Sequence, residues 1–190
     1  MTKRLRIWFV LATAVGCAAF ATPSVAGASV WGPPGGTHTL DALSFSFAVT
    51  TVGGGWTCAT SLGIHVRNLP DSWADITNVS FTNCSGTGAF GTCAVTMAYT
   101  GVPGALDGFS PSIINFRVHA DVGFSGTTCV VAGTNVTVGG KLTDGAWSAF
   151  THSVAFAGAP GLTASTSGVS LGPVPVTGLL VDTANTLTLS

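Results

Sequence analysis

Apolar residues occupy every second position along much of this chain. The alternation is clearest over residues 43–49, 56–66, 93–99 and 114–124. In the first of these stretches the apolar parity holds Leu43, Phe45, Phe47 and Val49. Successive side chains of a β-strand point to opposite faces, so each stretch predicts a strand with one face on a core. With short connections between them, these strands predict an all-β chain that folds as a single antiparallel β-sandwich or barrel-like domain.

Two segments between the strands carry their own expectations. The pair Asp144-Gly145 lies between Leu142 and Trp147 and predicts a tight hairpin. Residues 157–178 are rich in Gly, Pro and Ser, and we expect a long loop or an irregular edge there, before a last strand.

The N-terminus has the order of a secretory signal peptide. A basic region with Lys3, Arg4 and Arg6 precedes an apolar run over residues 7–16. Small residues at 24–26 predict cleavage after Ala26, and residues 26–28 offer a second position after Ala28. The expected organisation is a signal peptide over 1–26, an N-terminal extension over 27–38 and an all-β domain over 39–190.

Two other fates of this N-terminal segment stay open. One is an uncleaved membrane anchor, although the apolar run is shorter than the roughly 20 residues of a spanning helix. The other is a lipid-modified cysteine at Cys17, whose flanking residues fit a lipoprotein signal only loosely.

The charge of the mature chain narrows the range of partners. After Ala26 three basic residues face seven aspartates, a net charge of −4 with His neutral, and the chain has no Glu or Gln. A basic patch for nucleic acid is therefore not expected. A surface of Thr, Ser, Gly and Asn suits contact with polysaccharide or a cell envelope, and it is equally typical of an inert secreted domain.

Cysteines that follow the signal peptide are even in number, namely Cys58, Cys84, Cys93 and Cys129. In an exported chain four cysteines predict two disulfides. A zinc site would usually show a close C-x-x-C pair, which this sequence lacks. The count alone leaves three connectivities open.

Several short motifs resemble a loose group of secreted actinobacterial β-proteins of unknown function. The resemblance spans about residues 39–145 and rests on Trp56-Thr57-Cys58, residues 76–84, residues 101–106 and Gly126-Thr127-Thr128-Cys129. It implies that Cys58 pairs with Cys84. A later cysteine of the group is missing here and Cys93 is extra, so the second bridge is expected between Cys93 and Cys129. The resemblance implies no activity.

Two sets of residues are candidate sites. Asn115, Arg117, His119 and Asp121 are spaced by two and are expected on one strand face, and His65 and Arg67 repeat the pattern earlier. If the two strands were neighbours, His65, His119 and Asp121 could hold a metal ion or act as an acid–base set. The alternative is a solvated polar face with cross-strand ion pairs.

The second set is a loop with Asp71, Trp73 and Asp75. A tryptophan flanked by carboxylates could stack on a sugar ring or help to bind calcium, or it could plug the end of a sandwich. Matches to G-x-G-x-x-G at 86–91 and G-x-S-x-G at 168–172 lack the following helix that those motifs need.

These observations predict a secreted, non-enzymatic extracellular or cell-surface β-domain whose ligand is unknown, with envelope or polysaccharide contact as the candidate. No catalytic residue, resident metal or cofactor is predicted. Two alternatives stay open: an envelope-embedded β-barrel, and a secreted hydrolase or metal-binding protein that uses the face of His119 and Asp121.

Overall fold

The computed structural model describes residues 30–68, 73–101, 105–110 and 113–189. Within these ranges all regular secondary structure is β-strand, and the predicted all-β fold is confirmed. The predicted signal peptide and Cys17 lie outside the described residues. The strands are β1 (Trp31–Gly32), β2 (Thr37–Val49), β3 (Gly54–Val66), β4 (Trp73–Gly88), β5 (Ala94–Tyr99), β6 (Ala105–Ser110), β7 (Ile113–Ser125), β8 (Asn135–Ser148), β9 (Ser153–Ala159), β10 (Leu162–Thr166), β11 (Val169–Pro173), β12 (Val176–Asp182) and β13 (Thr188–Leu189).

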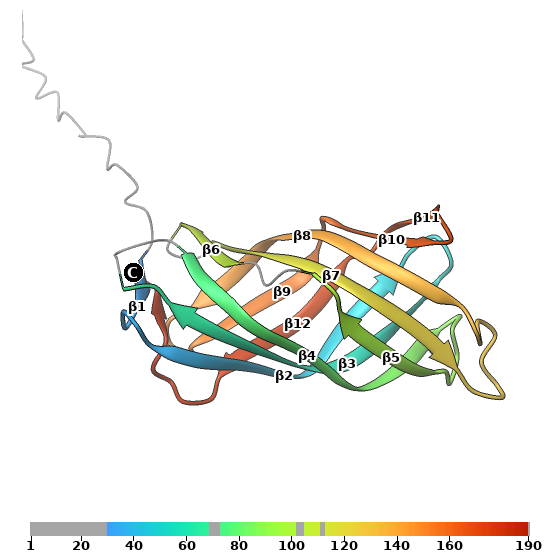
Figure 1. Ribbon diagram of the computed structural model, residues 1–190, viewed down its shortest axis with the longest axis horizontal. Coiled ribbons are helices and arrows are strands. Elements are labelled where there is room, and N and C mark those ends of the chain that lie inside the picture. Colours follow the sequence, from blue (N-terminus) through green and yellow to red (C-terminus); the bar gives the residue numbers. More distant parts are fainter. Residues whose placement is uncertain (1–29, 69–72, 102–104, 111–112, 190) are drawn as a thin grey trace, which may run out of the picture.

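The large sheet closes on itself as a ring of antiparallel strands. The ring runs β2–β3–β4–β5–β7–β8–β9–β12 and returns from β12 to β2. β6 lies in line with β5 between β4 and β7, and β10 lies in line with β9 along β8. Figure 1 shows the result as an elongated barrel-like wall around one interior. A ring of this size leaves an interior that side chains can fill.

Aromatic side chains fill much of that interior. Trp56 is fully buried and stacks on Phe47, with ring centroids 5.4 Å apart. The ring of Phe124 meets Trp56 edge-on at 5.8 Å, and Trp56 Nε1 donates a hydrogen bond to Met97 Sδ at 3.4 Å. The alternation predicted from the sequence therefore places the apolar parity inside and the polar parity outside, because only the inner face escapes water.

The first and last described strands, β1 and β13, help to close one end of the barrel. β1 pairs with β13, and Trp31 packs edge-on against Trp147 with a centroid distance of 5.5 Å. This end lies at the left of Figure 1. Among the described residues strand pairing therefore begins at Trp31, inside the segment 27–38 that the sequence pattern assigns to an extension before the domain.

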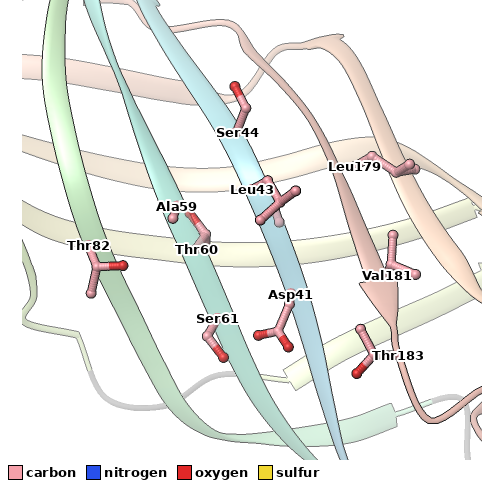
Figure 2. Close-up of a pocket in the computed structure, with 11 residues that line it drawn as sticks. Asp41, Leu43, Ser44, Ala59, Thr60, Ser61, Thr82, Leu179, Val181 and Thr183 are labelled. Atoms are coloured by element: carbon pink, nitrogen blue, oxygen red, sulfur yellow. The ribbon is translucent and has the colours of Figure 1, made fainter.

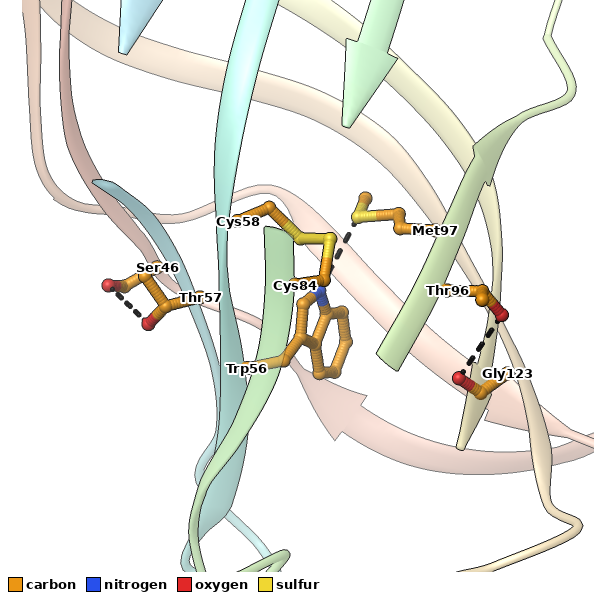
Figure 3. The surroundings of a disulfide bond; sticks show 8 residues. All are labelled: Ser46, Trp56, Thr57, Cys58, Cys84, Thr96, Met97 and Gly123. Carbon is orange, nitrogen blue, oxygen red and sulfur yellow. Dashed lines mark hydrogen bonds between the residues drawn. A yellow bond between two sulfur atoms is a disulfide. The ribbon is translucent and has the colours of Figure 1, made fainter. Parts of the chain in front are cut away.

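Two disulfides tie neighbouring parts of the wall together, with the expected connectivity. Cys58 of β3 is bonded to Cys84 of β4, and Figure 3 shows this bridge beside Trp56 and Met97. Cys93, just before β5, is bonded to Cys129 in the connection between β7 and β8. The second bridge lies near Phe90 and Phe124, whose rings meet at 5.1 Å, and so helps to close the other end of the barrel.

Two local expectations are wrong, and a third holds in one of its two forms. Leu43 does not share the buried face of Phe45, because β2 bulges between Ala42 and Phe45 and turns Leu43 outward, 97% exposed. Asp144-Gly145 is no hairpin: Asp144 has a positive φ inside β8, where the register with β7 shifts, and the hairpin follows at 149–152. A residue with left-handed backbone occurs both in some bulges and in tight type I′ turns, so the dipeptide does not distinguish the two. For residues 157–178 the second alternative holds: β10 and β11 pair as a hairpin at the edge of the sheet, with a register shift between Ala164 and Ser165, and this irregular edge takes the place of a long loop.

In the part of the chain that the structure describes, no helix is long and apolar enough to cross a membrane.

Candidate functional site

Arg67, Trp73 and Asp75 come together on the outer surface at one end of the barrel. Val66 at the end of β3 is paired with Ala74 of β4, and both point into the core. Strand alternation therefore turns the residues on either side of this pair outward. We call Arg67, Trp73 and Asp75 the tryptophan surface. In the sequence, Arg67 belongs to one candidate set and the other two residues belong to another.

A bidentate ion pair holds this surface in shape. Arg67 Nε lies 3.1 Å from each carboxylate oxygen of Asp75, and Arg67 Nη2 lies 2.6 Å from Asp75 Oδ1. The guanidinium carbon of Arg67 lies 5.9 Å from the centroid of the Trp73 ring, within the range of a cation–π contact. Trp73 nevertheless keeps 45% of its surface exposed, so the indole is oriented without being covered.

The charges of the ion pair are stable to changes in pH near neutrality. The hydrogen bonds from Arg67 are the largest influence on Asp75 and lower its pKa below 3.8, helped by the charges of Arg67 and His65 and opposed by partial burial. His65 is the cross-strand partner of Asp75. Exposed ion pairs contribute only about 0–1 kcal/mol to stability. The main effect of this pair is therefore to fix the positions of the Arg67 guanidinium and the Asp75 carboxylate.

The chemistry of the tryptophan surface suits a hydroxylated, flat ligand. An indole ring offers an apolar face, and an Arg–carboxylate pair offers N–H donors beside oxygen acceptors. A sugar ring needs this combination, since its C–H face is apolar and its rim carries hydroxyls. Asp71, the third residue of the predicted ligand loop, lies outside the described residues.

The polar face of β7 forms only in part. Arg117, His119 and Asp121 are exposed on the outer side, whereas Asn115 is buried, next to a register shift with β8. Asp121 accepts a hydrogen bond from Thr137 Oγ1 at 3.0 Å. Arg117 lies opposite Lys141, and a like-charged pair across two strands is unfavourable unless another group screens it.

His65 does not join His119 and Asp121. The strand order β3–β4–β5–β7 puts two strands between them, so the convergent set that the sequence allowed does not form. Among the described residues, no three His, Cys, Asp or Glu side chains gather in a way that could hold a metal ion.

Sequence reasoning missed two features of the structure. A network joins buried His38 and Asp182 with exposed Thr186 before β13, and no sequence motif predicted it. A groove of about 790 Å³ crosses the outer face of β12, β2, β3 and β4. Its main apolar residue, Leu43, was assigned to the core, because the bulge that turns it outward leaves no signal in the alternation.

Neither of the two glycine motifs is followed by a helix in the described residues, and both lie at turns between strands. β4 ends at Gly88 and β5 begins at Ala94, and residues 168–172 lie in the β10–β11 hairpin. Comparison with known proteins gave no match to a protein-family model, to a curated protein or to a solved structure.

Proposed function

We propose that this chain is a secreted, non-enzymatic domain that contacts polysaccharide of a cell envelope through the tryptophan surface. The observation that carries the proposal is an indole that stays 45% exposed while a bidentate Arg67–Asp75 pair fixes its surroundings. A large exposed aromatic side chain costs solvation free energy, so a fixed orientation beside polar groups favours a role in binding.

Export is supported by the redox chemistry of the chain. Two disulfides indicate an oxidising, extracellular type of compartment. The N-terminal segment has the matching features of a secretory signal peptide, which are basic residues, an apolar run and a small-residue cleavage position.

The direction of the side chains favours a secreted domain over an envelope-embedded barrel. Lipid-facing strands present apolar residues outward and often polar residues inward. Here most apolar residues of the strands point inward, and the outer positions of β7 and β8 include Arg117, Asp121, Thr137 and Lys141. The hydrolase hypothesis loses its main support, because His65 and His119 lie on strands that are not neighbours.

Expression of the full-length chain in a secreting bacterial host tests the export part of the proposal. We expect protein in the medium that begins at Gly27 or Ser29, with a mass four hydrogens below that of the reduced form because two disulfides have formed. Intact mass spectrometry with and without reductant measures both. Recovery only from the detergent-extracted envelope would contradict secretion, and an added lipid mass at Cys17 would identify a lipoprotein.

Replacing the indole tests the binding part of the proposal. We expect Trp73→Ala to weaken binding to an insoluble polysaccharide by about tenfold, the loss that corresponds to about 1.4 kcal/mol of aromatic contact. The measurement is depletion of the mature protein from solution by peptidoglycan, chitin or cellulose. Arg67→Lys should also weaken binding, because it keeps the charge but loses the planar fork.

The matched control for this experiment is Phe150→Ala. Phe150 is another exposed aromatic residue, 95% exposed at the hairpin between β8 and β9, and its removal should leave binding unchanged. Equal binding by Trp73→Ala and the unmodified protein would overturn the proposed surface. Failure of the unmodified protein to bind all three polysaccharides would overturn the proposed class of ligand.

A further inference from the structure

β2 bulges at one level, and its pairing shifts there with both of its neighbours in the barrel wall. The register of β2 with β3 shifts between Ala42 and Phe45, and the register of β12 with β2 shifts between Gly178 and Val181. Leu43 and Ser44 are consequently skipped in the ladders on both sides of β2. The wall is therefore irregular at this point, and side chains of the bulged residues project outward.

The irregularity forms the groove noted above, which has a volume of about 790 Å³ and is open to solvent. Its size lies within the roughly 300–1,000 Å³ of pockets that hold small molecules. Figure 2 shows its lining residues, which are Asp41, Ala42, Leu43, Ser44, Ala59, Thr60, Ser61, Thr82, Leu179, Val181 and Thr183.

Most of the accessible lining is apolar. Leu43 is 97% exposed and Leu179 is 48% exposed, and Val181 and Ala59 extend the same surface. A single exposed leucine needs no explanation, but a hollow lined by adjoining apolar side chains is typical of a binding site. An apolar ligand in this groove would remove these side chains from water.

One charged group lies in the groove. Asp41 is the only ionisable residue among those that line it, and within the described part of the chain its carboxylate has no hydrogen bond or ion pair. Asp41 is paired across the strands with Ser61 on one side and Val181 on the other. Figure 2 shows Asp41, Ser61 and Thr183 toward one end of the groove, with Leu43 and Leu179 further along.

We propose that the groove binds a single-chain amphiphile with a cationic head group. The carboxylate of Asp41 attracts the head, and Leu43, Leu179 and Val181 cover the apolar chain. Charge complementarity selects the sign of the head, because the groove offers one negative group and no positive one. An extended peptide fits less well, since only two residues of β2 are left out of the ladders and strand addition needs a longer free edge.

Three detergents with the same decyl chain test the proposal on the mature, disulfide-bonded protein. The probes are decyltrimethylammonium, decyl maltoside and decyl sulfate, each titrated below its micelle concentration and followed by amide chemical shifts. We expect the cationic probe to bind about tenfold more tightly than the neutral one, with the sulfate weakest. The shifts should centre on residues 41–44 and 179–183.

Two substitutions separate the charge from the apolar contact. Asp41→Asn should abolish the preference for the cationic probe, and Leu43→Ser should weaken all three probes by about tenfold. Neither is expected to disturb folding, since Leu43 is almost wholly exposed and the Asp41 carboxylate lacks a partner in the described residues. Matched controls are Asp121→Asn on β7 and Val130→Ser, an apolar residue 83% exposed elsewhere.

Several results would overturn the proposal. These are equal binding of the three probes, a cationic preference that survives in Asp41→Asn, no binding of any probe, or a Leu43→Ser variant that binds like the unmodified protein. Self-association in sedimentation experiments that disappears in Leu43→Ser would assign the groove to a second copy of the chain instead. None of these outcomes depends on polysaccharide binding, because the tryptophan surface uses other residues.

Discussion

A variant with alanine at Cys58, Cys84, Cys93 and Cys129 is expected to be largely unfolded at 37 °C. The bridges join residues 26 and 36 positions apart, and on the chain-entropy model loops of this length each contribute about 3–4 kcal/mol. Their combined contribution of about 7 kcal/mol is comparable with the entire free energy of unfolding of a domain, about 5–15 kcal/mol. Urea unfolding followed by tryptophan fluorescence measures the loss.

The two bridges can be removed separately as controls. Cys58→Ala with Cys84→Ala removes a bridge between two strands that are already paired over most of their length. Cys93→Ala with Cys129→Ala frees the connection between β7 and β8 that covers Phe90 and Phe124. We expect each pair to lower the unfolding free energy by about 3–4 kcal/mol. A four-alanine variant within about 2 kcal/mol of the unmodified protein, a bound on the scale of one bridge, would contradict this account.

The fold class can be predicted from the sequence because alternation is a direct consequence of strand geometry. In β3 the apolar parity of Trp56 and Ile64 is buried and the polar parity of Thr57 and His65 is not, as the pattern predicts. Ring closure, in contrast, depends on which strands pair. The contact of β12 with β2 joins residues more than 120 positions apart, such as Val176 with Phe47, and nothing local in the sequence specifies it.

Bulges account for most of the wrong local expectations. An extra residue reverses the parity of the residues after it, so Leu43 is counted with Phe45 although the two side chains point to opposite sides of the wall. The same effect separates Asn115, which is buried, from Arg117. Periodicity identifies the two faces of a strand only between bulges, and the sequence does not mark where a bulge falls.

The candidate sites differ in whether neighbouring or distant segments of the sequence form them. Arg67 and Asp75 flank a single connection between paired strands, so their contact is a consequence of the β3–β4 hairpin and could have been predicted. The meeting of His65 with His119 required a particular strand order, which the structure does not have. The groove at Leu43 depends on the bulge in β2, which shifts the register with both neighbouring strands and which the alternation of the sequence does not predict.

Asp182→Ala is expected to lower the free energy of unfolding by about 3–5 kcal/mol. Asp182 is 0% exposed, and its carboxylate accepts backbone N–H groups of Ala184 at 3.2 Å, Thr186 at 2.8 Å and Leu187 at 2.7 Å. These bonds fold the turn that brings β13 back to β1. Alanine would leave three amide groups without an acceptor, each at a cost of about 1–3 kcal/mol where it stays buried.

The matched control for Asp182 is Asp121→Asn, which replaces an exposed carboxylate on β7. Away from buried networks such changes usually stay within about 0.5 kcal/mol. Urea unfolding of both variants at neutral pH measures the difference. A loss below about 1 kcal/mol for Asp182→Ala would show that water satisfies the turn, and that the carboxylate does not organise the chain ends.

The same carboxylate should set part of the acid sensitivity of the fold. Burial alone raises the pKa of Asp182, but the three backbone hydrogen bonds, together with the charge of His38 at 3.8 Å, outweigh it and hold the pKa below the ordinary 3.8. A carboxyl group with a pKa lowered by folding stabilises the protein fully above its unfolded value, and this contribution is lost as the pH falls through the folded value. Stability should therefore decline below about pH 4.

Because Asp182→Asn cannot titrate, urea midpoints between pH 7 and pH 2 should fall less steeply for it than for the unmodified protein. The slope that remains includes Asp75, whose pKa is also lowered, and the double variant with Asp75→Asn should flatten further. Parallel acid profiles for Asp182→Asn and the unmodified protein would mean that the ionised carboxylate does not hold this end of the barrel closed.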